Sequence, residues 1–347
     1  MKIMRVGVDL AKNVFQVHAV DQYDKPVWRH SLKRHQWLAE LERRVSPDAQ
    51  IGMEACAGSH HWARALQQRG YRVKLIAPQF VKPYVKSNKT DRNDAEAICE
   101  AMSRPAMRFV ALKSVEQQDI QAIHRVRSEL VRQRTSKANQ IRGLVGEYGL
   151  VAPLRIAQLR AALPDWLEDA DNGLTMRFRR LLAGLWEDLR GLDGRIGELD
   201  REIKTLASES AAAQRLQQLR GVGPIIATAL VAALGDGTAF RKGRDFAVSL
   251  GLTPKQHSSG GKAHLLGISK RGDAYVRQLM VHGARAAVRT ASQHHDALSL
   301  WIQRLSQRKH TNVVVVALAN KTARMAWALL RHDSDYEPQL AARLVHD

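Results

Sequence analysis

The stretch MRVGVDLAKNVFQVHAV, residues 4–20, contains two apolar, β-prone runs separated by the turn-like Ala11-Lys12-Asn13. Two such runs around a turn predict a β-hairpin, with Asp9 at the end of its first strand. Helix-like and strand-like segments alternate from there onward: a helix near 36–45, a strand at 49–53 ending in Glu54, a helix at 55–70, a strand at 71–77, and a helix that Thr90 could cap. This alternation predicts an α/β layer structure for residues 1–112.

The rest of the chain reads as helical. An amphipathic basic helix is expected at 115–148, and apolar residues spaced alternately by four and three run from Phe178 to Leu206. Four heptads of this kind predict a coiled coil. Glycines inside it weaken the helix by about 1 kcal/mol each, so it needs a partner: the 115–148 helix, a second chain, or both. The predicted fold class is therefore α/β plus all-α, with a helical coiled-coil spacer at 113–210 and a helical domain at 211–347.

Charge predicts a polyanionic partner. The 347-residue chain has a net charge of +20 and a pI near 10.4. The net charge is +8 over residues 1–110, +3 over 111–150, −2 over 151–210 and +11 over 211–347. Two nucleic-acid-facing modules joined by a spacer would produce this partition.

Compartment and membrane signals point the same way. The N-terminus reads as a strand without a signal-type apolar region, and no apolar run reaches 18 residues. Cys56 and Cys99 form no spaced pattern, as expected in a reducing compartment. We therefore expect a cytoplasmic protein with no membrane partner.

Four carboxylates form a candidate metal site. In KSNKTDRNDA, residues 86–95, Asp91 and Asp94 are three residues apart and share one side of a helix. Asp9 and Glu54 end two strands, and strand ends can converge with an adjacent helix on one cleft. Four carboxylates in one place repel one another unless divalent cations neutralise them. Mg²⁺ (or Mn²⁺) in such a site would support phosphoryl transfer.

Basic residues surround the two aspartates of this helix. Lys86, Lys89 and Arg92 would contact substrate phosphates if the carboxylates hold metal. A solvated helix face with ordinary charge pairing explains the same stretch without any chemistry. Spacing alone leaves both interpretations open.

The motif LRGVGPIIATALVA, residues 219–232, has the glycine turn and flanking apolar pattern of a helix-hairpin-helix. The backbone N–H groups around Gly221 and Gly223 would bind a nucleic-acid phosphate without reading bases. A plain helical hairpin with a tight turn is the alternative.

Serines lie in a basic loop further on, GLTPKQHSSGGK at residues 251–262. Ser258 and Ser259 precede two glycines, and serine becomes a nucleophile where cations or a metal stabilise its alkoxide. A flexible phosphate-binding loop is the simpler interpretation. Nothing in the sequence orients His257 or His264 as a general base. The cations near these serines are Lys262, Lys270 and Arg271.

Six motifs in order, GVDLAK, MEACAGSHHWA, KTDRNDA, LRGVGP, SLGLTPKQHSSGGK and ISKRGDAYVR, together resemble the DEDD transposases of bacterial insertion sequences. The resemblance covers nearly the whole chain. These transposases are serine recombinases guided by a bridge RNA, and their relatives include pilin-gene-inverting invertases. The resemblance implies an RNase H-like (RuvC-like) N-terminal domain, a coiled-coil spacer and a helical transposase domain.

The resemblance also implies roles for single residues. Asp9, Glu54, Asp91 and Asp94 correspond to the metal ligands, and Ser259, rather than its neighbour Ser258, corresponds to the serine that forms a covalent phosphoserine link to DNA. The implied partners are donor DNA, target DNA, a structured guide RNA and other copies of the chain, a dimer assembling to a tetramer through the coiled coil. The implied location is the bacterial nucleoid.

Three functions compete at this point. The first is an RNA-guided site-specific DNA recombinase with a serine nucleophile and a metal site. The second is a junction resolvase in which metal-activated water attacks, leaving free 5′-phosphate ends and no protein–DNA adduct. The third is a non-catalytic nucleic-acid-binding scaffold, for which Asp91→Ala or Glu54→Ala would change no activity.

Overall fold

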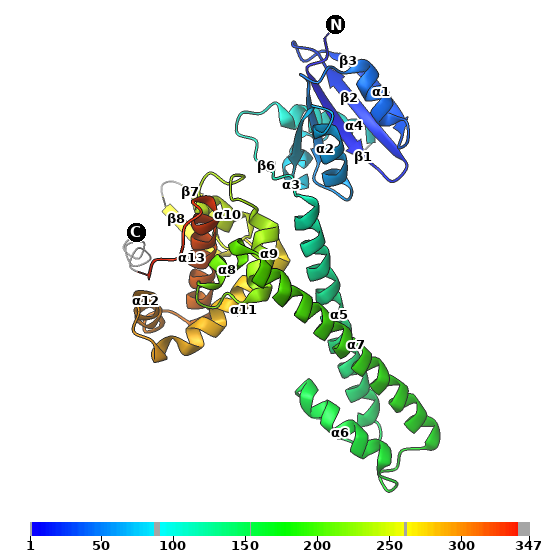
Figure 1. Cartoon of the computed structure of the whole chain (residues 1–347), viewed down its shortest axis with the longest axis vertical. Helices are drawn as coiled ribbons and strands as arrows, with labels where there is room; N and C mark the ends of the chain where they lie inside the picture. Colours follow the sequence, from blue (N-terminus) through cyan, green and yellow to red (C-terminus); the bar gives the residue numbers. More distant parts are fainter. Residues whose placement is uncertain (1, 87–90, 153, 260–261, 339–347) are drawn as a thin grey trace. The chain divides into compact units, whose positions relative to one another are not determined.

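The chain folds as two units of structure, Met1–Ser114 and Val115–Asp347 (Figure 1). The computed structural model describes residues 2–86, 91–152, 154–259 and 262–338, apart from the side chains of residues 91, 262 and 263. Thr90, the expected helix cap, and Lys89 lie outside the described residues. The predicted domain boundaries at residues 112 and 210 stay predictions.

A six-stranded mixed sheet forms the centre of the first unit, in the order β3-β2-β1-β4-β5-β6. The hairpin expected at 4–20 is present as an antiparallel pair, and β1 also pairs in parallel with β4, which pairs in parallel with β5. The strands are β1 Arg5–Leu10, β2 Val14–Val20, β3 Pro26–Lys33, β4 Gln50–Glu54, β5 Arg72–Ile76 and β6 Phe109–Val110. The α/β prediction for this part of the chain is thus confirmed, while its RNase H-like identity stays a prediction.

Helices cover both faces of this sheet. Alternate residues of the strands, such as Val6 and Val8, pack in one core with residues of α1 (Trp37–Arg44) and α2 (Ser59–Gln67). The opposite face is covered by α4 (Asp91–Met102), together with the short α3 (Pro78–Val81) and η1 (Lys82–Tyr84). The odd-numbered residues of β1 therefore face α4, because side chains alternate along a strand.

Gly7 lets α4 lie directly on the sheet. A Cβ atom at Gly7 would lie 2.2 Å from the carbonyl oxygen of Ala95 and 2.6 Å from the backbone nitrogen of Cys99. Gly52, the β4 residue paired with Gly7, faces Ile98 and Met102 of the same helix. The absence of a side chain at Gly7 thus fixes how close α4 comes to β1.

Gly7→Ala should lower the unfolding free energy by about 3 kcal/mol, because the helix backbone must move to admit the methyl group. Gly184→Ala is a suitable control. A Cβ there meets open space, and alanine raises helix propensity by about 1 kcal/mol. Urea unfolding of the full chain measures both changes. An unchanged midpoint for Gly7→Ala would contradict the close packing of α4.

An antiparallel helical hairpin opens the second unit. It consists of α5 (Val115–Gly146) and α7 (Met176–Glu209), with α6 (Ile156–Glu168) between them in sequence. Ion pairs join the two long helices: Arg134 to Asp193 at 3.2 Å and Lys137 to Asp188 at 2.9 Å. Two apolar positions of each heptad in α7 face the core to different degrees. From Leu182 onward, the first position is buried and the second is half-buried. The heptad-containing helix α7 thus packs against α5 of the same chain. That the two form a coiled coil stays a prediction. The buried set is Leu182, Leu189, Ile196 and Ile203, and the half-buried set is Leu185, Leu192, Leu199 and Leu206.

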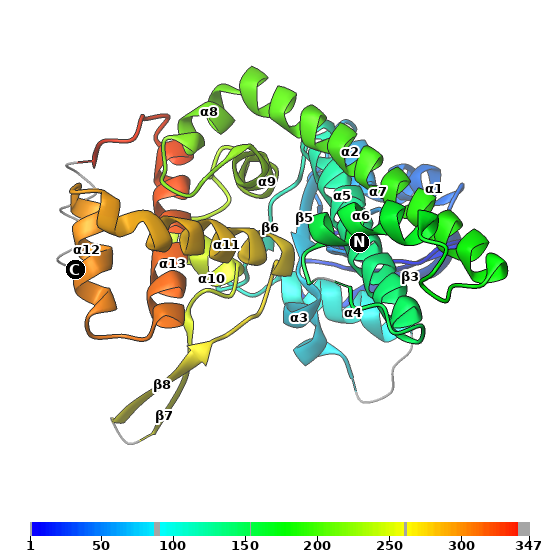
Figure 2. The same ribbon diagram turned by 90° about the horizontal axis from the view of Figure 1, so that it is seen from below.

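The rest of the second unit is mainly helical, as predicted for the end of the chain. Its helices pack in one core with α13 (Figure 2). The helices α8 and α9 lie before and after the glycine turn at 221–223, and the helix-hairpin-helix identity of this motif stays a prediction. By length and composition α13 could cross a membrane, but more than half of its apolar window is buried within the protein. The helices are α8 Ala211–Gln217, α9 Pro224–Leu234, α10 Gly243–Ser249, α11 Ala274–Thr290, η2 Ala291–Gln293, α12 Ala297–Ser306 and α13 Thr311–Arg331.

The prediction of a basic loop at residues 251–262 is wrong in part. Ser258 and Ser259 belong to β7 (Pro254–Ser259), which pairs antiparallel with β8 (Lys262–Ile268). Figure 2 shows this hairpin extending away from α10, α11 and α13. Every residue of β7 is exposed. The C-terminal part of the chain therefore contains a two-stranded ribbon in addition to its helices.

Candidate active site

Asp9 and Glu54 lie side by side where two central strands, β1 and β4, end; we call this end of the strands the carboxylate edge of the sheet. β1 and β4 are parallel with Val8 opposite Met53, so the next residues along, Asp9 and Glu54, are also neighbours. Both face α4, because each is two residues beyond a glycine that faces that helix. Burial raises the pKa of the Cys56 thiol, and the charges of Glu54 and Asp9 raise it further.

The first turn of α4 points toward the same edge. Ala95 contacts Gly7, and Cys99, one turn later, interacts with the side chain of Arg5 at the start of β1. The helix therefore runs opposite to β1, and its beginning, with Asp91 and Asp94, lies toward Asp9. Asp94 is half-buried, and the side chain of Asp91 lies outside the description.

The chemistry of these donors fits a hard divalent cation, because Mg²⁺ and Mn²⁺ prefer carboxylate oxygens. Among the described side chains, no group of three or more His, Cys, Asp or Glu is arranged to hold a metal ion. Asp9 and Glu54 are the pair that the fold brings together. Asp91, the residue that would extend the set, is outside that search.

Lys86 and Arg92, two of the predicted phosphate contacts, differ in their surroundings. The Nζ of Lys86 lies 2.8 Å from Glu96 of α4, and Arg29 of β3 lies 3.8 Å from the same carboxyl. The hydrogen bond from Lys86 lowers the pKa of Glu96. Arg92 is exposed at the start of α4. Lys86 is thus held in an ion pair with α4, and Arg92 is open to solvent.

The two serines face opposite sides of the β7–β8 hairpin. Ser259 pairs with Lys262 and Ser258 with Ala263, while His257 is directly opposite His264. The Oγ of Ser258 accepts a 2.7 Å hydrogen bond from the side chain of Gln256. Gly260 and Gly261, which follow Ser259, lie outside the described residues. The carboxylates belong to the first unit and the serines to the second.

Backbone hydrogen bonds anchor the base of this hairpin. The N–H of Lys270 donates to Gly251 (3.1 Å), and that of Asp273 donates to Ser249 (3.2 Å). The guanidinium of Arg277 donates to the carbonyl of Leu250 at 2.8 Å. Lys270 and Arg271, both exposed, therefore lie where the ribbon meets α10 and α11.

In the predicted helix-hairpin-helix, the two glycines are in different surroundings. Gly221 packs against the backbone of Gly283 in α11. Gly223 is exposed, and a Cβ atom there would meet open space. A phosphate could therefore approach this turn from the side of Gly223 and the start of α9.

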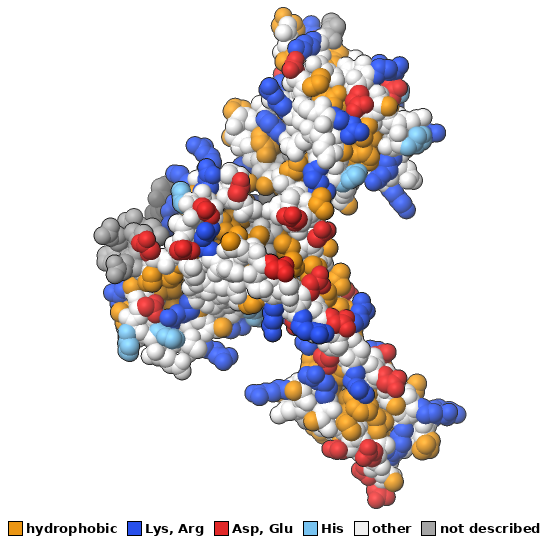
Figure 3. Space-filling view, in the orientation of Figure 1, with side chains coloured by type: hydrophobic (Ala, Val, Ile, Leu, Met, Phe, Trp, Pro, Cys, Tyr) orange, Lys and Arg blue, Asp and Glu red, His pale blue; other side chains and the backbone are white. Residues whose placement is uncertain are grey.

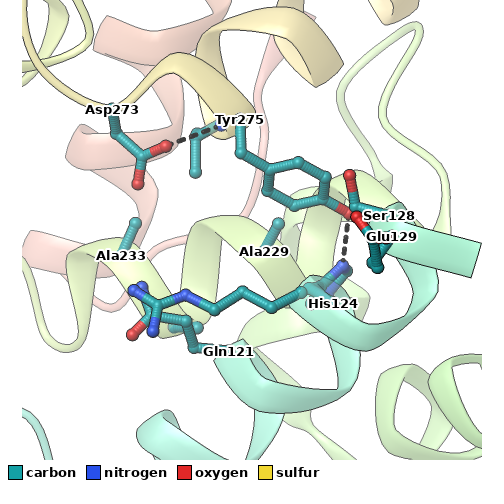
Figure 4. Close-up of a pocket in the computed structure, with 11 residues that line it drawn as sticks. Gln121, His124, Ser128, Glu129, Ala229, Ala233, Asp273 and Tyr275 are labelled. Atoms are coloured by element: carbon teal, nitrogen blue, oxygen red, sulfur yellow. Dashed lines mark hydrogen bonds between the residues drawn. The ribbon is translucent and has the colours of Figure 1, made fainter. Parts of the chain in front are cut away.

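A buried histidine that the sequence did not single out joins three helices of the second unit. His124 of α5 lies 2.9 Å from the hydroxyl of Tyr275 in α11 and 2.9 Å from that of Thr228 in α9. Figure 4 shows Tyr275 and His124 pointing toward one another in a pocket of about 430 Å³. Since the Thr228 hydroxyl donates to the carbonyl of Pro224, it accepts from Nε2 of His124, and Nδ1 accepts from Tyr275. A neutral imidazole satisfies this arrangement.

His124 should make stability depend on pH. Burial, with the charge of Arg127, lowers its pKa from 6.5 to about 4. The unfolded state therefore binds a proton first, and the contribution of neutral His124, complete above pH 6.5, is lost as the pH falls toward 4. Between pH 7.5 and 5, the wild type should lose about 2 kcal/mol of unfolding free energy that His124→Gln does not lose. Urea unfolding at both pH values measures this. Equal losses in the two proteins would contradict it.

Comparison with known proteins identifies relatives of the whole chain. Residues 213–299 match a family described as "Transposase IS116/IS110/IS902 family", and residues 6–149 match a second family described as "Transposase". A "Probable family 20 transposase" of Pseudomonas aeruginosa is 50% identical, covering 97% of this chain and 100% of the relative. The "Transposase for insertion sequence element IS1111A" of Coxiella burnetii is 44% identical, covering 97% and 92%. The "Pilin gene-inverting protein" of Moraxella bovis is 21% identical, covering 81% and 78%.

Proposed function

Because the chain belongs to the IS116/IS110/IS902 family of transposases, enzymes that cut and join DNA, we propose that it moves its insertion sequence by RNA-guided, site-specific recombination with a serine nucleophile. The observation that carries the chemical part of this proposal is the adjacency of Asp9 and Glu54 on the face covered by α4. The proposed substrates are donor and target DNA in the cytoplasm of a bacterium.

Asp9, Glu54, Asp91 and Asp94 would hold Mg²⁺ or Mn²⁺. Such an ion would polarise the phosphoryl oxygens and stabilise charge that develops during transfer. The chain's own contribution is to hold two carboxylates on a rigid sheet edge and to bring the first turn of α4 toward them. The role of each of the four residues stays a proposal.

Ser259 would be the nucleophile. Its Oγ bonds to phosphorus while the bond from phosphorus to one sugar oxygen breaks; the serine loses its proton and the released sugar oxygen gains one. A strand hydroxyl then attacks the phosphoserine and loses its proton, the bond from phosphorus to Oγ breaks, and the serine oxygen regains a proton as the DNA is rejoined. Support comes from the position of Ser259 at the end of an exposed basic ribbon and from the order of motifs around it.

Nucleic acid would be held by basic side chains and by open backbone amides. The guide RNA and the DNA both fit the excess positive charge of the two end regions. Exposure supports this role for Arg92, Gly223, Lys270 and Arg271, whereas Lys86 would first have to leave Glu96. The full proposed set is Lys86, Lys89, Arg92, Gly221, Gly223, Lys262, Lys270 and Arg271.

The helical hairpin would join copies of the chain, a dimer assembling to a tetramer. Large hydrophobic side chains are exposed around α5, α6 and α7, among them Val151 at 90% and Leu154 at 92%. Figure 3 shows hydrophobic side chains gathered at the surface of this arm. Apolar surface of this kind is a common mark of a protein–protein interface.

A strand-exchange assay tests the proposed function. Supercoiled donor and target DNA are incubated with the full chain, Mg²⁺ and the RNA transcribed from the flank of the element. Recombinant product together with DNA-linked protein on a denaturing gel is the expected result. Cleavage with free 5′-phosphate ends and no linked protein would instead favour a junction resolvase that uses water.

A further inference from the structure

A basic pocket with an aromatic wall lies at the sheet edge that carries Asp9 and Glu54. The strands β1, β3 and β4 all end at this edge, because β3 and β1 are both antiparallel to β2. The pocket has a volume of about 580 Å³. We call it the Arg34 pocket; its lining consists of Asn13, Val14, Lys33, Arg34, His35 and Trp62.

Arg34 is held in place by stacking and by backbone contacts. The carbon at the centre of its guanidinium lies 5.4 Å from the ring centre of Trp62 and 5.9 Å from that of Phe15. One guanidinium N–H donates to the carbonyl of Lys12 at 3.3 Å, and the backbone N–H of Arg34 donates to Asn13 at 2.9 Å. A guanidinium stacked in this way is oriented before any ligand arrives, and it still has further N–H groups to donate.

The charge around Arg34 suits an anion. Lys12, Lys33 and His35 are exposed beside it, and the described lining of the pocket contains no carboxylate. This differs from the face of the sheet covered by α4, where Lys86 is paired with Glu96 of that helix. The pocket thus combines cations with the half-exposed ring of Trp62. Proteins bind nucleic-acid strands with this combination, because cations contact the phosphates and bases stack on the ring.

Residues that line the pocket are close in sequence to Asp9. Asn13 is four residues from Asp9, so their Cα atoms are at most about 14 Å apart. Phosphates follow one another at about 3.4 Å of rise along a duplex strand. Phe15 and Trp62 pack in the core with α1 and α2. Asp9 and Glu54 face α4, so the pocket and the carboxylates lie on opposite faces of the sheet at this end. A strand that passes around the end of β1 from Asp9 and Glu54 would present another phosphate to the pocket after about four nucleotides.

We propose that the Arg34 pocket binds a backbone phosphate of the DNA strand within about four nucleotides of the cut, and that Arg34 thereby positions the strand at Asp9 and Glu54. The inference rests on the proposed function, because it takes these carboxylates as the place of cutting. Arg34 is a positioning residue in this proposal and takes no part in bond breaking.

A double-mutant cycle between protein and DNA tests the pocket directly. The full chain binds DNA carrying the end of its element in EDTA, and single phosphates within four nucleotides of the cut are replaced by neutral methylphosphonates. At one or two positions on one side of the cut, the wild type should lose about tenfold in affinity. Arg34→Gln should bind natural DNA about tenfold more weakly and lose nothing further at those positions.

Arg72→Gln is the matched control. Like Arg34, Arg72 is an exposed arginine in the first unit. It lies at the start of β5, at the end of the strands opposite Asp9 and Glu54. Its effect should add to that of the methylphosphonate at every position. Arg34→Lys, which keeps the charge, should keep part of the coupling, and circular dichroism shows that each variant is folded.

Additive losses for Arg34→Gln at every position would overturn the inference, as would weaker binding of the guide RNA with DNA binding unchanged. Because no strand is cut in EDTA, this result does not depend on the serine or the metal. Loss of recombination in Ser259→Ala together with additive cycles would leave the proposed function standing and remove only the Arg34 pocket.

Discussion

Ser259→Ala should abolish the covalent protein–DNA adduct and reduce strand exchange by at least about a thousandfold, as expected when a nucleophile is removed. Ser258→Ala should keep both the adduct and the exchange. The two serines are adjacent, but they face opposite sides of the hairpin, and the Ser258 hydroxyl already accepts from Gln256. The two variants remove the same atom from the same exposed strand, so each is the other's control.

The measurement is a denaturing gel of DNA-linked protein, with quantified recombinant product. If the adduct is lost in Ser258→Ala and retained in Ser259→Ala, the nucleophile is Ser258 and the assignment to Ser259 is wrong. Cleavage without any adduct in wild type and in both variants would remove the serine mechanism and leave a hydrolytic enzyme.

Asp9→Asn and Glu54→Gln should each reduce DNA cleavage by about a thousandfold while DNA binding is retained. Loss of a metal ligand removes several kcal/mol of transition-state stabilisation, and each 1.36 kcal/mol is tenfold in rate. Glu100→Gln is the control, since Glu100 is an exposed carboxylate near the other end of α4 from Asp91 and is paired with Arg104.

Binding of the ion gives a readout that does not depend on activity. Adding Mg²⁺ should raise the melting temperature of the wild type and of Glu100→Gln, because a ligand that binds only the folded state stabilises it. Asp9→Asn should show a smaller rise. Full cleavage by Asp9→Asn and Glu54→Gln, or an equal rise in melting temperature, would show that the ion does not bind at these carboxylates.

Burial determined which parts of the fold were predictable. β1, β2, β4 and α13 have strong apolar patterns because they are covered on one or more faces. β3 was missed because PVWRHSLK has one fully buried residue and is held at the edge of the sheet mainly by pairing with β2. β7 was read as a loop because an exposed ribbon has no apolar period to detect.

The candidate site was predictable in its residue types and only partly in its arrangement. Strand-end acids and the spacing of Asp91 and Asp94 indicated a metal site, but the sequence did not say that β1 and β4 are neighbours. That pairing is set by the order of strands in the sheet. His124 and Arg34 were missed because a single polar residue in a helix, or a single arginine after a strand, is ordinary until its partners are known.

The exposed β7–β8 ribbon has a consequence for the speed of the reaction. A two-stranded hairpin without a core is only marginally ordered, whereas Asp9 and Glu54 lie on central strands covered on both faces. The carboxylates are therefore pre-organised, and the serine must lose conformational freedom before it attacks. We expect the ordering of this ribbon in the assembled complex, and not the breaking of the phosphodiester bond, to limit the rate of turnover.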